Sequence, residues 1–312
     1  HQLIEDSMKI FMTGSSGFIG KYLTERLSGK HEIIHMVSNL EEYERVNEEI
    51  SMAQPDIVLH LAARTEVESS FYEHVDFSII NYVGSVNLIE ACRKVKNLKL
   101  FLFASTMETY GWQEVSDLVK NGKALHWAKD YAFDEQTPQN ANAPYAVAKV
   151  AVEKYLEYAA RSYGLPWAAI RQTNCYGRWD NTFFVMESII SQMIKSDSIN
   201  LGYSKPYRNF IFIEDLLDFY ELMIDNYDKA SEGKVFCCGP NNPIRISDLA
   251  DIIAKKLNWT GKINWDTRPE RPGEIYYLSS KSDKAKEFFG FQHKVNLDEG
   301  IDKTIKLWQN QS

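Results

Sequence analysis

The sequence predicts an α/β fold, with a doubly wound parallel sheet followed by a smaller C-terminal lobe. Short, almost entirely apolar runs alternate with stretches of helical periodicity through residues 8–170, as buried parallel strands and their covering helices do. A glycine-rich turn directly follows the first apolar run. The alternation loosens after residue 171, and a length of 312 residues suits about two domains.

The first apolar run, residues 8–12, leads directly into the sequence TGSSGFIG at residues 13–20. Gly14 and Gly17 can adopt positive φ and let a phosphate approach the backbone, while Gly20 lets the following helix pack against the strand. Free N–H groups at the start of that helix then face an anion. This pattern indicates a dinucleotide site in a Rossmann-type domain. The predicted cofactor contacts here are Gly14, Ser16, Gly17, Phe18, Ile19 and Gly20.

The second apolar run covers residues 31–37 and ends at Ser38 and Asn39. An NAD site of this kind usually has Asp or Glu here, to accept hydrogen bonds from the ribose hydroxyls. Neither Ser38 nor Asn39 would repel a 2′-phosphate, and the nearest arginine, Arg45, lies in an expected helix. We predict cofactor contacts from Ser38 and Asn39 and leave open whether the cofactor is NAD or NADP.

Two further strands are expected, DIVLHLAA at residues 56–63 and LKLFLFA at residues 98–104. A short polar helix at residues 40–52 precedes the first of them, and residues 81–95 between them have helical spacing. Open α/β sheets bind ligands beyond the carboxyl ends of their strands. The contacts predicted there are Leu61, Ala62 and Ala63 for the cofactor, and Arg64, Thr106 and Met107 for the substrate.

A long irregular insert follows at residues 112–142, and its aromatic residues Trp112, Trp127 and Tyr131 favour a lid over a disordered segment.

The next expected helix begins near residue 144 and carries Tyr145 and Lys149 one turn apart, so both project from one face. Hydride transfer from a sugar carbon requires a base for the hydroxyl proton, and a phenol with an ordinary pKa of about 10 is a poor one at neutral pH. A neighbouring ammonium favours the phenolate. Thr106 can hydrogen-bond the same oxygen. We therefore predict Thr106, Tyr145 and Lys149 as catalytic residues, and Tyr145 and Lys149 as cofactor contacts as well.

The rest of the chain contains a strand at residues 167–171 and a basic, proline-stiffened loop at residues 268–274. Amphipathic helices are expected at residues 184–195, 216–227, 246–257 and 297–309. Arg208 and Arg271 could clamp a diphosphate through bidentate hydrogen bonds, with surface ion pairs as the alternative. We assign residues 8–170 mainly to a dinucleotide-binding domain and residues 171–312 mainly to a substrate-binding lobe, with some segments returning to the first domain.

A net charge of −8 at pH 7 leaves no basic surface for nucleic acid or an anionic membrane. No apolar stretch reaches membrane-spanning length, and the first residues lack the pattern of a signal peptide. The four cysteines, Cys92, Cys175, Cys237 and Cys238, show no metal-ligand spacing, so we expect free thiols, no metal site and a cytoplasmic protein. Residues 1–7 precede Met8 and are expected to be an addition outside the fold.

Seven motifs, in order along the chain, resemble the extended short-chain dehydrogenase/reductase family, and within it the nucleotide-sugar epimerases and dehydratases. They are TGSSGFIG (13–20), HLAA (60–63), ASTMETYG (104–111), YAVAK (145–149), RQTNCYG (171–177), RNFIFIED (208–215) and RPGE (271–274). The resemblance implies an NAD(P)-dependent enzyme that acts on a nucleotide-diphosphate sugar in carbohydrate biosynthesis. It also implies catalytic Thr106, Tyr145 and Lys149, a substrate contact from Asn174, and diphosphate contacts from Arg208 and Arg271. Homodimers would form through the helices at about 81–95 and 145–162.

Glu108 distinguishes among the activities of this family. It lies two residues after Thr106, as in the Thr-x-Glu arrangement of sugar-nucleotide 4,6-dehydratases. We therefore favour a 4,6-dehydratase, a lyase, in which catalytic Glu108 removes the C5 proton of a 4-keto intermediate. Met107 stands where the best-known dTDP-glucose dehydratases carry an acidic Asp. A 4-epimerase, a UDP-glucuronate decarboxylase and a 4-keto-sugar reductase stay open as alternatives, and so does a non-catalytic dinucleotide sensor.

Overall fold

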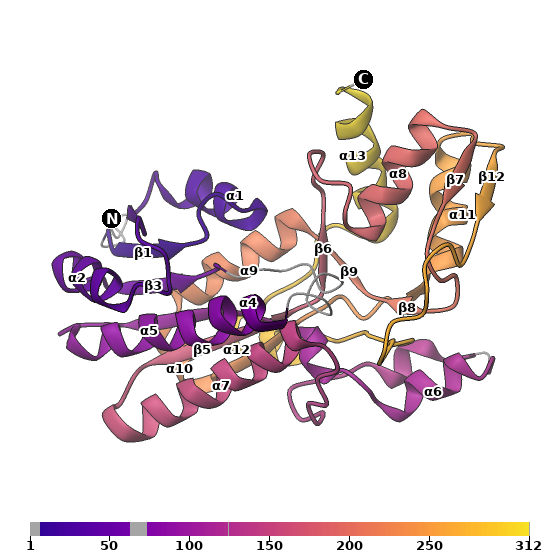
Figure 1. The fold of residues 1–312 in the computed structure, drawn as a ribbon. Helices are drawn as coiled ribbons and strands as arrows, with labels where there is room; N and C mark the ends of the chain where they lie inside the picture. Colours follow the sequence, from indigo (N-terminus) through magenta and orange to yellow (C-terminus); the bar gives the residue numbers. More distant parts are fainter. Residues whose placement is uncertain (1–6, 63–73, 124, 312) are drawn as a thin grey trace.

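The computed structural model describes residues 7–62, 74–123 and 125–311. Its central feature is a six-stranded sheet in the order β10-β5-β4-β3-β1-β2, in which every neighbouring pair is parallel (Figure 1). The strands are β1 (Lys9–Thr13), β2 (Glu32–His35), β3 (Ile57–His60), β4 (Leu100–Thr106), β5 (Trp167–Gln172) and β10 (Val235–Cys238). The predicted doubly wound α/β sheet is confirmed, and β10 reaches it from the C-terminal half of the chain.

The inner strands of the sheet are buried on both faces, as their continuous apolar sequences require. All seven residues of β4 are buried. Because successive side chains of a strand point to opposite faces, Leu100 and Leu102 join one hydrophobic cluster, and Phe101 and Phe103 join another. Two layers of helices therefore hold β4 in the middle of the molecule, and its carboxyl end at Thr106 is fixed.

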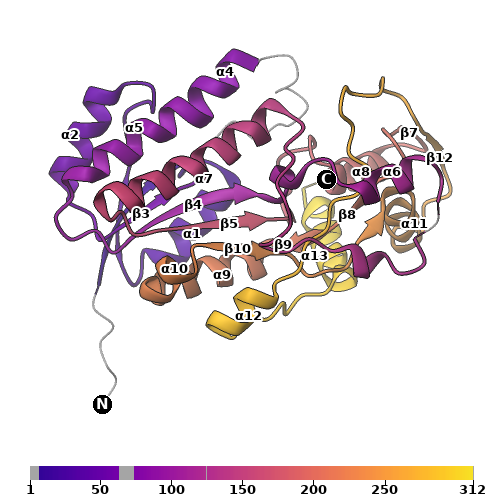
Figure 2. The ribbon, with the colours of Figure 1, turned by 90° about the horizontal axis from the view of Figure 1, so that it is seen from below.

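Helices cover the two faces in separate layers, which Figure 2 shows edge-on. One layer contains α2 (Tyr43–Ala53), α4 (His74–Ser78), α5 (Gly84–Ala91) and α7 (Pro144–Tyr163). The other contains α1 (Phe18–Leu27), α9 (Ile213–Asp225) and α10 (Tyr227–Gly233). A π-helical turn, Ile79–Val83, joins α4 to α5, and a 3-10 turn, Cys92–Lys94, follows α5, so the helix expected at residues 81–95 is real but irregular.

The described residues of the insert at 112–142 are a packed part of the molecule and do not form a lid over the cavity. It contains α6 (Glu114–Lys120) and a 3-10 turn (Ala128–Tyr131). Val115 and Val119 of α6 are buried in a third hydrophobic cluster with residues 275–278. The ends of the insert meet where Trp112 N donates to the carbonyl oxygen of Asn140, 3.0 Å away. Of its described residues, Asn142 alone lines the large cavity of the molecule.

The C-terminal lobe lies beyond the carboxyl ends of the strands (Figures 1 and 2). Its main helices are α8 (Val185–Lys195), α11 (Ile246–Lys256) and α13 (Leu297–Gln309). Three two-stranded sheets connect them: β6 (Asn174–Tyr176) with β9 (Phe210–Phe212), β7 (Ser198–Asn200) with β12 (Lys262–Asn264), and β8 (Tyr207–Arg208) with β11 (Ile244–Arg245). Helix α12 (Asp283–Phe289) packs against β10. One continuous hydrophobic cluster joins the lobe to the sheet.

Throughout the described part of the chain, no helix combines the length and apolar character that crossing a membrane would need.

Candidate active site

A cavity of about 1300 Å³ lies between the carboxyl edge of the sheet and the C-terminal lobe. The turn after β1, the ends of β3 and β4, and the first turns of α7 line one side of it. The segments around Asn174, Phe184, Arg208 and Arg271 line the other. Ligand sites of open α/β sheets lie at this edge. The cavity is large enough for a dinucleotide and a second ligand together.

The glycine-rich turn leaves bare backbone facing this cavity. Gly14 has a φ of +74°, and a Cβ atom there would lie 2.7 Å from the backbone nitrogen of Ala62. A Cβ at Gly20 would overlap the carbonyl oxygen of Gly14. Gly17 precedes α1 and offers no side-chain cap, so the first N–H groups of the helix are available to a ligand. These features fit the diphosphate of a dinucleotide.

The other predicted cofactor contacts divide into three groups. Ser16, Phe18, Ile19, Leu61 and Ala62 line the cavity together with the glycines. Ser38 and Asn39 do not line it. The backbone N–H and hydroxyl of Ser38 donate to Glu49 of α2, which also accepts from Val37 N at 2.9 Å. A carboxylate thus reaches the end of β2 from a helix, which sequence spacing did not reveal. Ala63 and Arg64 lie outside the described residues.

The structure brings Thr106, Tyr145 and Lys149 together in the cavity, with exposed fractions of 7%, 7% and 3%. The Tyr145 hydroxyl is hydrogen-bonded to Thr106. Lys149 Nζ donates to the carbonyl oxygen of Ala104 at 2.8 Å and lies 5.7 Å from the centre of the Tyr145 ring. Three side chains from two distant segments therefore converge, as the sequence predicted.

Burial dominates the ionisation of this group. It raises the pKa of Tyr145, and the nearby charge of Glu108 raises it further, whereas the hydrogen bond to Thr106 lowers it. Burial also lowers the pKa of Lys149 to about 7, and the negative charge of Glu153 acts in the opposite direction. The charge of Lys149 therefore changes near neutral pH.

Helix α7 is held in register on the end of β4 by a polar contact from each of three successive turns. Tyr145 meets Thr106, Lys149 meets Ala104, and the Glu153 carboxylate accepts from Ser105 Oγ at 2.8 Å. These three helix residues are four positions apart and share one face.

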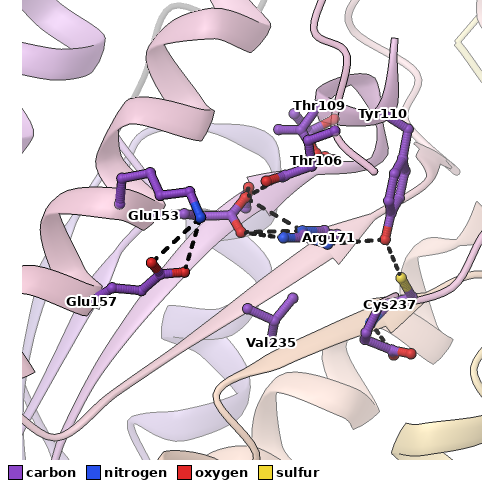
Figure 3. A network of polar contacts seen from close by, with 12 residues as sticks. Thr106, Thr109, Tyr110, Glu153, Glu157, Arg171, Val235 and Cys237 are labelled. Atoms are coloured by element: carbon purple, nitrogen blue, oxygen red, sulfur yellow. Dashed lines mark hydrogen bonds and ion pairs between the residues drawn. The ribbon is translucent and has the colours of Figure 1, made fainter. Parts of the chain in front are cut away.

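A second layer of buried polar groups continues this arrangement behind the cavity (Figure 3). Arg171 Nη2 donates to Glu153 Oε1 at 2.7 Å, and Arg171 Nη1 donates to the Tyr110 hydroxyl at 3.2 Å. The Tyr110 hydroxyl also contacts Cys237 Sγ at 2.9 Å. Residues of four separate segments therefore support the Tyr145–Lys149 pair. Sequence reasoning missed this layer, because only the fold brings these segments together.

Glu108 also lines the cavity. Its backbone N–H donates to Thr106 Oγ1 at 3.1 Å, which makes Thr106 the N-cap of a 3-10 turn (Met107–Tyr110) and fixes where Glu108 points. Burial raises the pKa of Glu108, and the charges of Arg208 and Arg271 oppose that rise. A raised pKa makes this carboxyl group a stronger proton acceptor than an exposed glutamate. Met107, in contrast, is fully buried in a hydrophobic cluster, so the structure does not bring this predicted substrate contact to the cavity.

Arginines supply positive charge to the opposite wall. Arg208 and Arg271, as predicted, line the cavity, and so does Arg268. Arg268 Nη2 and Arg271 Nε bind opposite oxygens of the Glu274 carboxylate, each at 3.2 Å. Arg208 donates to the carbonyl oxygen of Ile275 at 2.8 Å. The wall carries a net positive charge, which suits a diphosphate. Arg268 was not among the predicted contacts, although two arginines within four residues of a basic loop were a signal for it.

The fold and this cavity define a dinucleotide-binding protein of the Rossmann type with a polar site beside the cofactor turn. A family model, the NAD dependent epimerase/dehydratase family, matches residues 10–239. The chain belongs to this family, which confirms the resemblance to nucleotide-sugar epimerases and dehydratases and the predicted dependence on NAD or NADP.

Relatives carry both activities. A putative UDP-glucose 4-epimerase of Methanocaldococcus jannaschii is 26% identical over 96% of this chain and 98% of the relative. A dTDP-D-glucose 4,6-dehydratase of Homo sapiens is 25% identical over 96% of this chain and 90% of the relative. Among solved structures, a UDP-glucose 4-epimerase of Thermotoga maritima with UDP-glucose has a TM-score of 0.84 at 24% identity, covering 97% of this chain and 99% of that one. The fold is thus shared, and the activity has to be argued from the site.

Proposed function

We propose that this protein is an NAD(P)-dependent nucleotide-sugar 4,6-dehydratase. The observation that carries the proposal is the position of Glu108, whose carboxyl group shares the cavity with Thr106, Tyr145 and Lys149 and has a pKa raised by burial. A carboxyl group at this place adds an acid–base function to the set of residues that oxidises the sugar. A non-catalytic sensor would have no use for the complete set.

The first step is oxidation of the sugar at C4, for which the bound nicotinamide would supply the hydride acceptor. Tyr145 takes the proton of the C4 hydroxyl, and Thr106 holds the phenol oxygen through a hydrogen bond. The ammonium of Lys149 stabilises the phenolate, because an opposite charge nearby lowers the pKa of a phenol. Gly14, Ser16, Gly17, Phe18, Ile19, Gly20, Leu61 and Ala62 would hold the cofactor.

The second step is elimination of water across C5 and C6. The 4-keto group acidifies the C5 proton, which Glu108 accepts. Glu108 then gives a proton to the C6 hydroxyl, the C6–O bond breaks, and water leaves. The hydride then returns to C6, and C5 takes up the proton that Tyr145 removed from the C4 hydroxyl, which completes a 6-deoxy-4-keto sugar. One carboxyl group performs both transfers in this scheme, because Met107 is buried away from the cavity.

The substrate would be held by its diphosphate against the arginine-rich wall. Arg208 and Arg271 are the proposed diphosphate contacts, and Asn174, which lines the same cavity, is a further proposed substrate contact. Guanidinium groups bind phosphate oxygens in pairs, and two arginines suit the two phosphates of a nucleotide sugar.

A 4-epimerase is the second candidate, and a specific finding favours it. Relatives in both Methanocaldococcus jannaschii and Mycolicibacterium smegmatis, each 26% identical, are named as UDP-glucose 4-epimerases, the first of them as putative. An epimerase would reduce the 4-keto sugar on its other face, and Glu108 would then contact the sugar without transferring protons.

Product masses distinguish the candidates. The protein is incubated with UDP-, GDP-, dTDP- and CDP-sugars and with either NAD⁺ or NADP⁺, and the products are weighed. A 4,6-dehydratase gives a product lighter by one water, an epimerase gives an unchanged mass, and a decarboxylase gives loss of carbon dioxide. An unchanged mass together with sugar inversion would exclude the dehydratase.

We also propose that the protein forms a homodimer through the outer faces of α5 and α7. Apolar side chains lie exposed on and beside these helices, with exposed fractions of 45% for Val83, 54% for Val147 and 41% for Tyr158. A second copy would cover them. Sedimentation velocity of the purified protein tests this, and a monomer at all concentrations would contradict it.

A further inference from the structure

Arg178 follows β6 and occupies a place where the two halves of the molecule meet. Its side chain is 7% exposed, and its guanidinium carbon lies 4.3 Å from the centre of the Phe18 ring and 4.0 Å from that of Phe184. Phe18 begins α1, directly after the glycine-rich turn, and Phe184 is the N-cap of α8 in the lobe. One buried cation therefore touches both the cofactor turn and the lobe.

The hydrogen bonds of Arg178 are incomplete. Nη1 donates to Glu187 Oε1 at 3.3 Å, an oxygen that also accepts from the backbone N–H groups of Gly177 and Arg178. Arg178 Nε and Glu187 Oε2 are both buried without a hydrogen-bond partner among the described residues. A buried charged donor without an acceptor is costly, and native structures rarely keep one without a reason.

The geometry of this ion pair leaves part of the guanidinium available. Glu187 contacts the guanidinium only at Nη1, at 3.3 Å. The edge formed by Nε and Nη2, which can donate two parallel hydrogen bonds, is not occupied by Glu187. That edge matches the spacing of two phosphate oxygens. The rings of Phe18 and Phe184, which both contact the Arg178 guanidinium, fix the orientation of its plane. The Nε donor is therefore already oriented before a ligand binds.

The surroundings show which kind of ligand fits. Arg178, Phe18, Phe184 and Glu187 all line the same cavity. Helix α1 begins at Phe18, and its first N–H groups are uncapped. Arg178 lies over the ring of this same residue. The N-terminus of α1 and the Nε edge of the Arg178 guanidinium therefore both supply positive potential to the same part of the cavity, which favours an anionic ligand.

We propose that Arg178 is a diphosphate-binding residue, which donates from Nε to the diphosphate held at the N-terminus of α1. The inference rests on the proposed function for its ligand, a dinucleotide cofactor or a nucleotide sugar. The position of Phe18 in the cofactor turn favours the dinucleotide. Arg178 also stacks on Phe184, the N-cap of α8 in the lobe. Binding of the cofactor diphosphate to Arg178 would therefore stabilise the position of the lobe.

The test compares binding constants and needs no turnover. Arg178→Met keeps an apolar chain between the two rings and removes every donor. NAD⁺, NADP⁺ and UDP are titrated separately into the unmodified protein and the variant by calorimetry. We expect affinity for the dinucleotide to fall about tenfold or more, as for loss of a hydrogen bond to a charged group, with affinity for UDP unchanged.

Arg245→Met is the matched control. Arg245 also lies over an aromatic ring, that of Tyr207 at 5.2 Å, and also has a buried Nε without a partner among the described residues, but it does not line the cavity. Its replacement should leave both affinities unchanged. Because Arg178→Met leaves the Glu187 carboxyl without its cation, Arg178→Met with Glu187→Gln is tested beside it, and thermal unfolding verifies that each variant is folded.

The outcomes separate the inference from the function on which it rests. If the Arg178 variants lose affinity for UDP and keep their affinity for the dinucleotides, Arg178 binds the diphosphate of the nucleotide sugar and not that of the cofactor. If the folded Arg178 variants bind NAD⁺, NADP⁺ and UDP as tightly as the unmodified protein does, the inference is overturned and the proposed function is unaffected. Failure of the unmodified protein to bind any of the three ligands would count against the proposed function itself.

Discussion

Glu153 and Arg171 form a buried ion pair directly behind the proposed catalytic tyrosine and lysine. Arg171 Nη2 lies 2.7 Å from Glu153 Oε1, and the two side chains are 8% and 1% exposed. Glu153 follows Lys149 by one helical turn, and its charge raises the pKa of the lysine while burial lowers it. The pair therefore helps to decide whether Lys149 carries a proton at the pH at which the enzyme works.

Replacing Glu153 by Gln should change the pH dependence of catalysis. Glu153→Gln keeps the shape and the contact with Ser105 but removes the charge that raises the pKa of Lys149. Lys149 then loses its proton at lower pH, and the phenolate of Tyr145 loses its stabilising ammonium. We expect the alkaline limb of the kcat profile to move to lower pH, with a larger loss of rate at pH 8 than at pH 6.

Two controls isolate this electrostatic effect. Glu157→Gln removes another carboxylate of the same helix (Figure 3), which pairs with exposed Lys154 at 3.4 Å, and it should leave the profile in place. Glu153→Gln combined with Arg171→Met removes both buried charges, because a single buried charge left alone costs about 3–5 kcal/mol of stability. Profiles that superimpose on that of the unmodified enzyme would show that Glu153 acts on structure alone.

Tyr145→Phe should abolish turnover and preserve cofactor binding. The phenyl ring keeps its place beside Lys149, but no hydroxyl remains to take the proton of the sugar. We expect a loss of kcat of at least about a hundredfold, the usual range for a positioned acid–base group, with the dissociation constant of NAD⁺ or NADP⁺ nearly unchanged in calorimetry. Activity close to that of the unmodified protein would remove Tyr145 from the mechanism.

Glu108→Gln should separate the two proposed steps. The amide cannot accept the C5 proton, so elimination stops, whereas oxidation at C4 needs only Thr106, Tyr145 and Lys149. In a single turnover we expect absorbance of the reduced nicotinamide to appear and persist, without release of 6-deoxy-4-keto sugar. Release of that product at the unmodified rate would show that Glu108 is not the base.

The sequence predicted those parts of the site that lie within one local segment. The spacing of Gly14, Gly17 and Gly20 and the one-turn separation of Tyr145 and Lys149 are local patterns, and the structure brings them to one cavity. Parallel strand ends also placed Thr106 there. The packed insert was mispredicted because the residues that bury α6, at 275–278, are far away in the chain.

Long-range contacts explain the other differences. Met107 is adjacent to Thr106 in sequence, but the 3-10 turn directs it into the core. Glu49 reaches the end of β2 from a neighbouring helix, and the side chain of Arg178 meets Phe18 across 160 positions of chain. Neither contact has a signature in spacing. The sequence alone therefore shows which functional side chains the chain contains, whereas the topology of the fold determines which of them come into contact.

His60 connects the cofactor turn to the helical layer through a chain of buried hydrogen bonds. Thr13 Oγ1 accepts from the backbone nitrogens of Leu61 and Ala62, at 3.1 and 3.0 Å, so it donates its own hydrogen to His60 Nδ1 at 2.7 Å. The proton of the neutral ring is then on Nε2, which donates to Ser85 Oγ at 2.8 Å. Every site of the neutral ring is satisfied, and a second ring proton would oppose the hydroxyl of Thr13.

Acid should therefore destabilise the protein through His60. Burial lowers the pKa of His60 from 6.5 to about 3, and the charge of Lys149 acts in the same direction. Because the unfolded chain binds this proton more readily than the folded one, the stability due to neutral His60 is complete above pH 6.5 and is lost as the pH falls toward 3. Urea unfolding between pH 7.5 and 4 should give a falling midpoint. His60→Gln should be less stable at pH 7 and show a flatter decline, whereas an equally steep decline in the variant would assign the acid sensitivity to other groups, such as His293, whose pKa burial lowers to about 4.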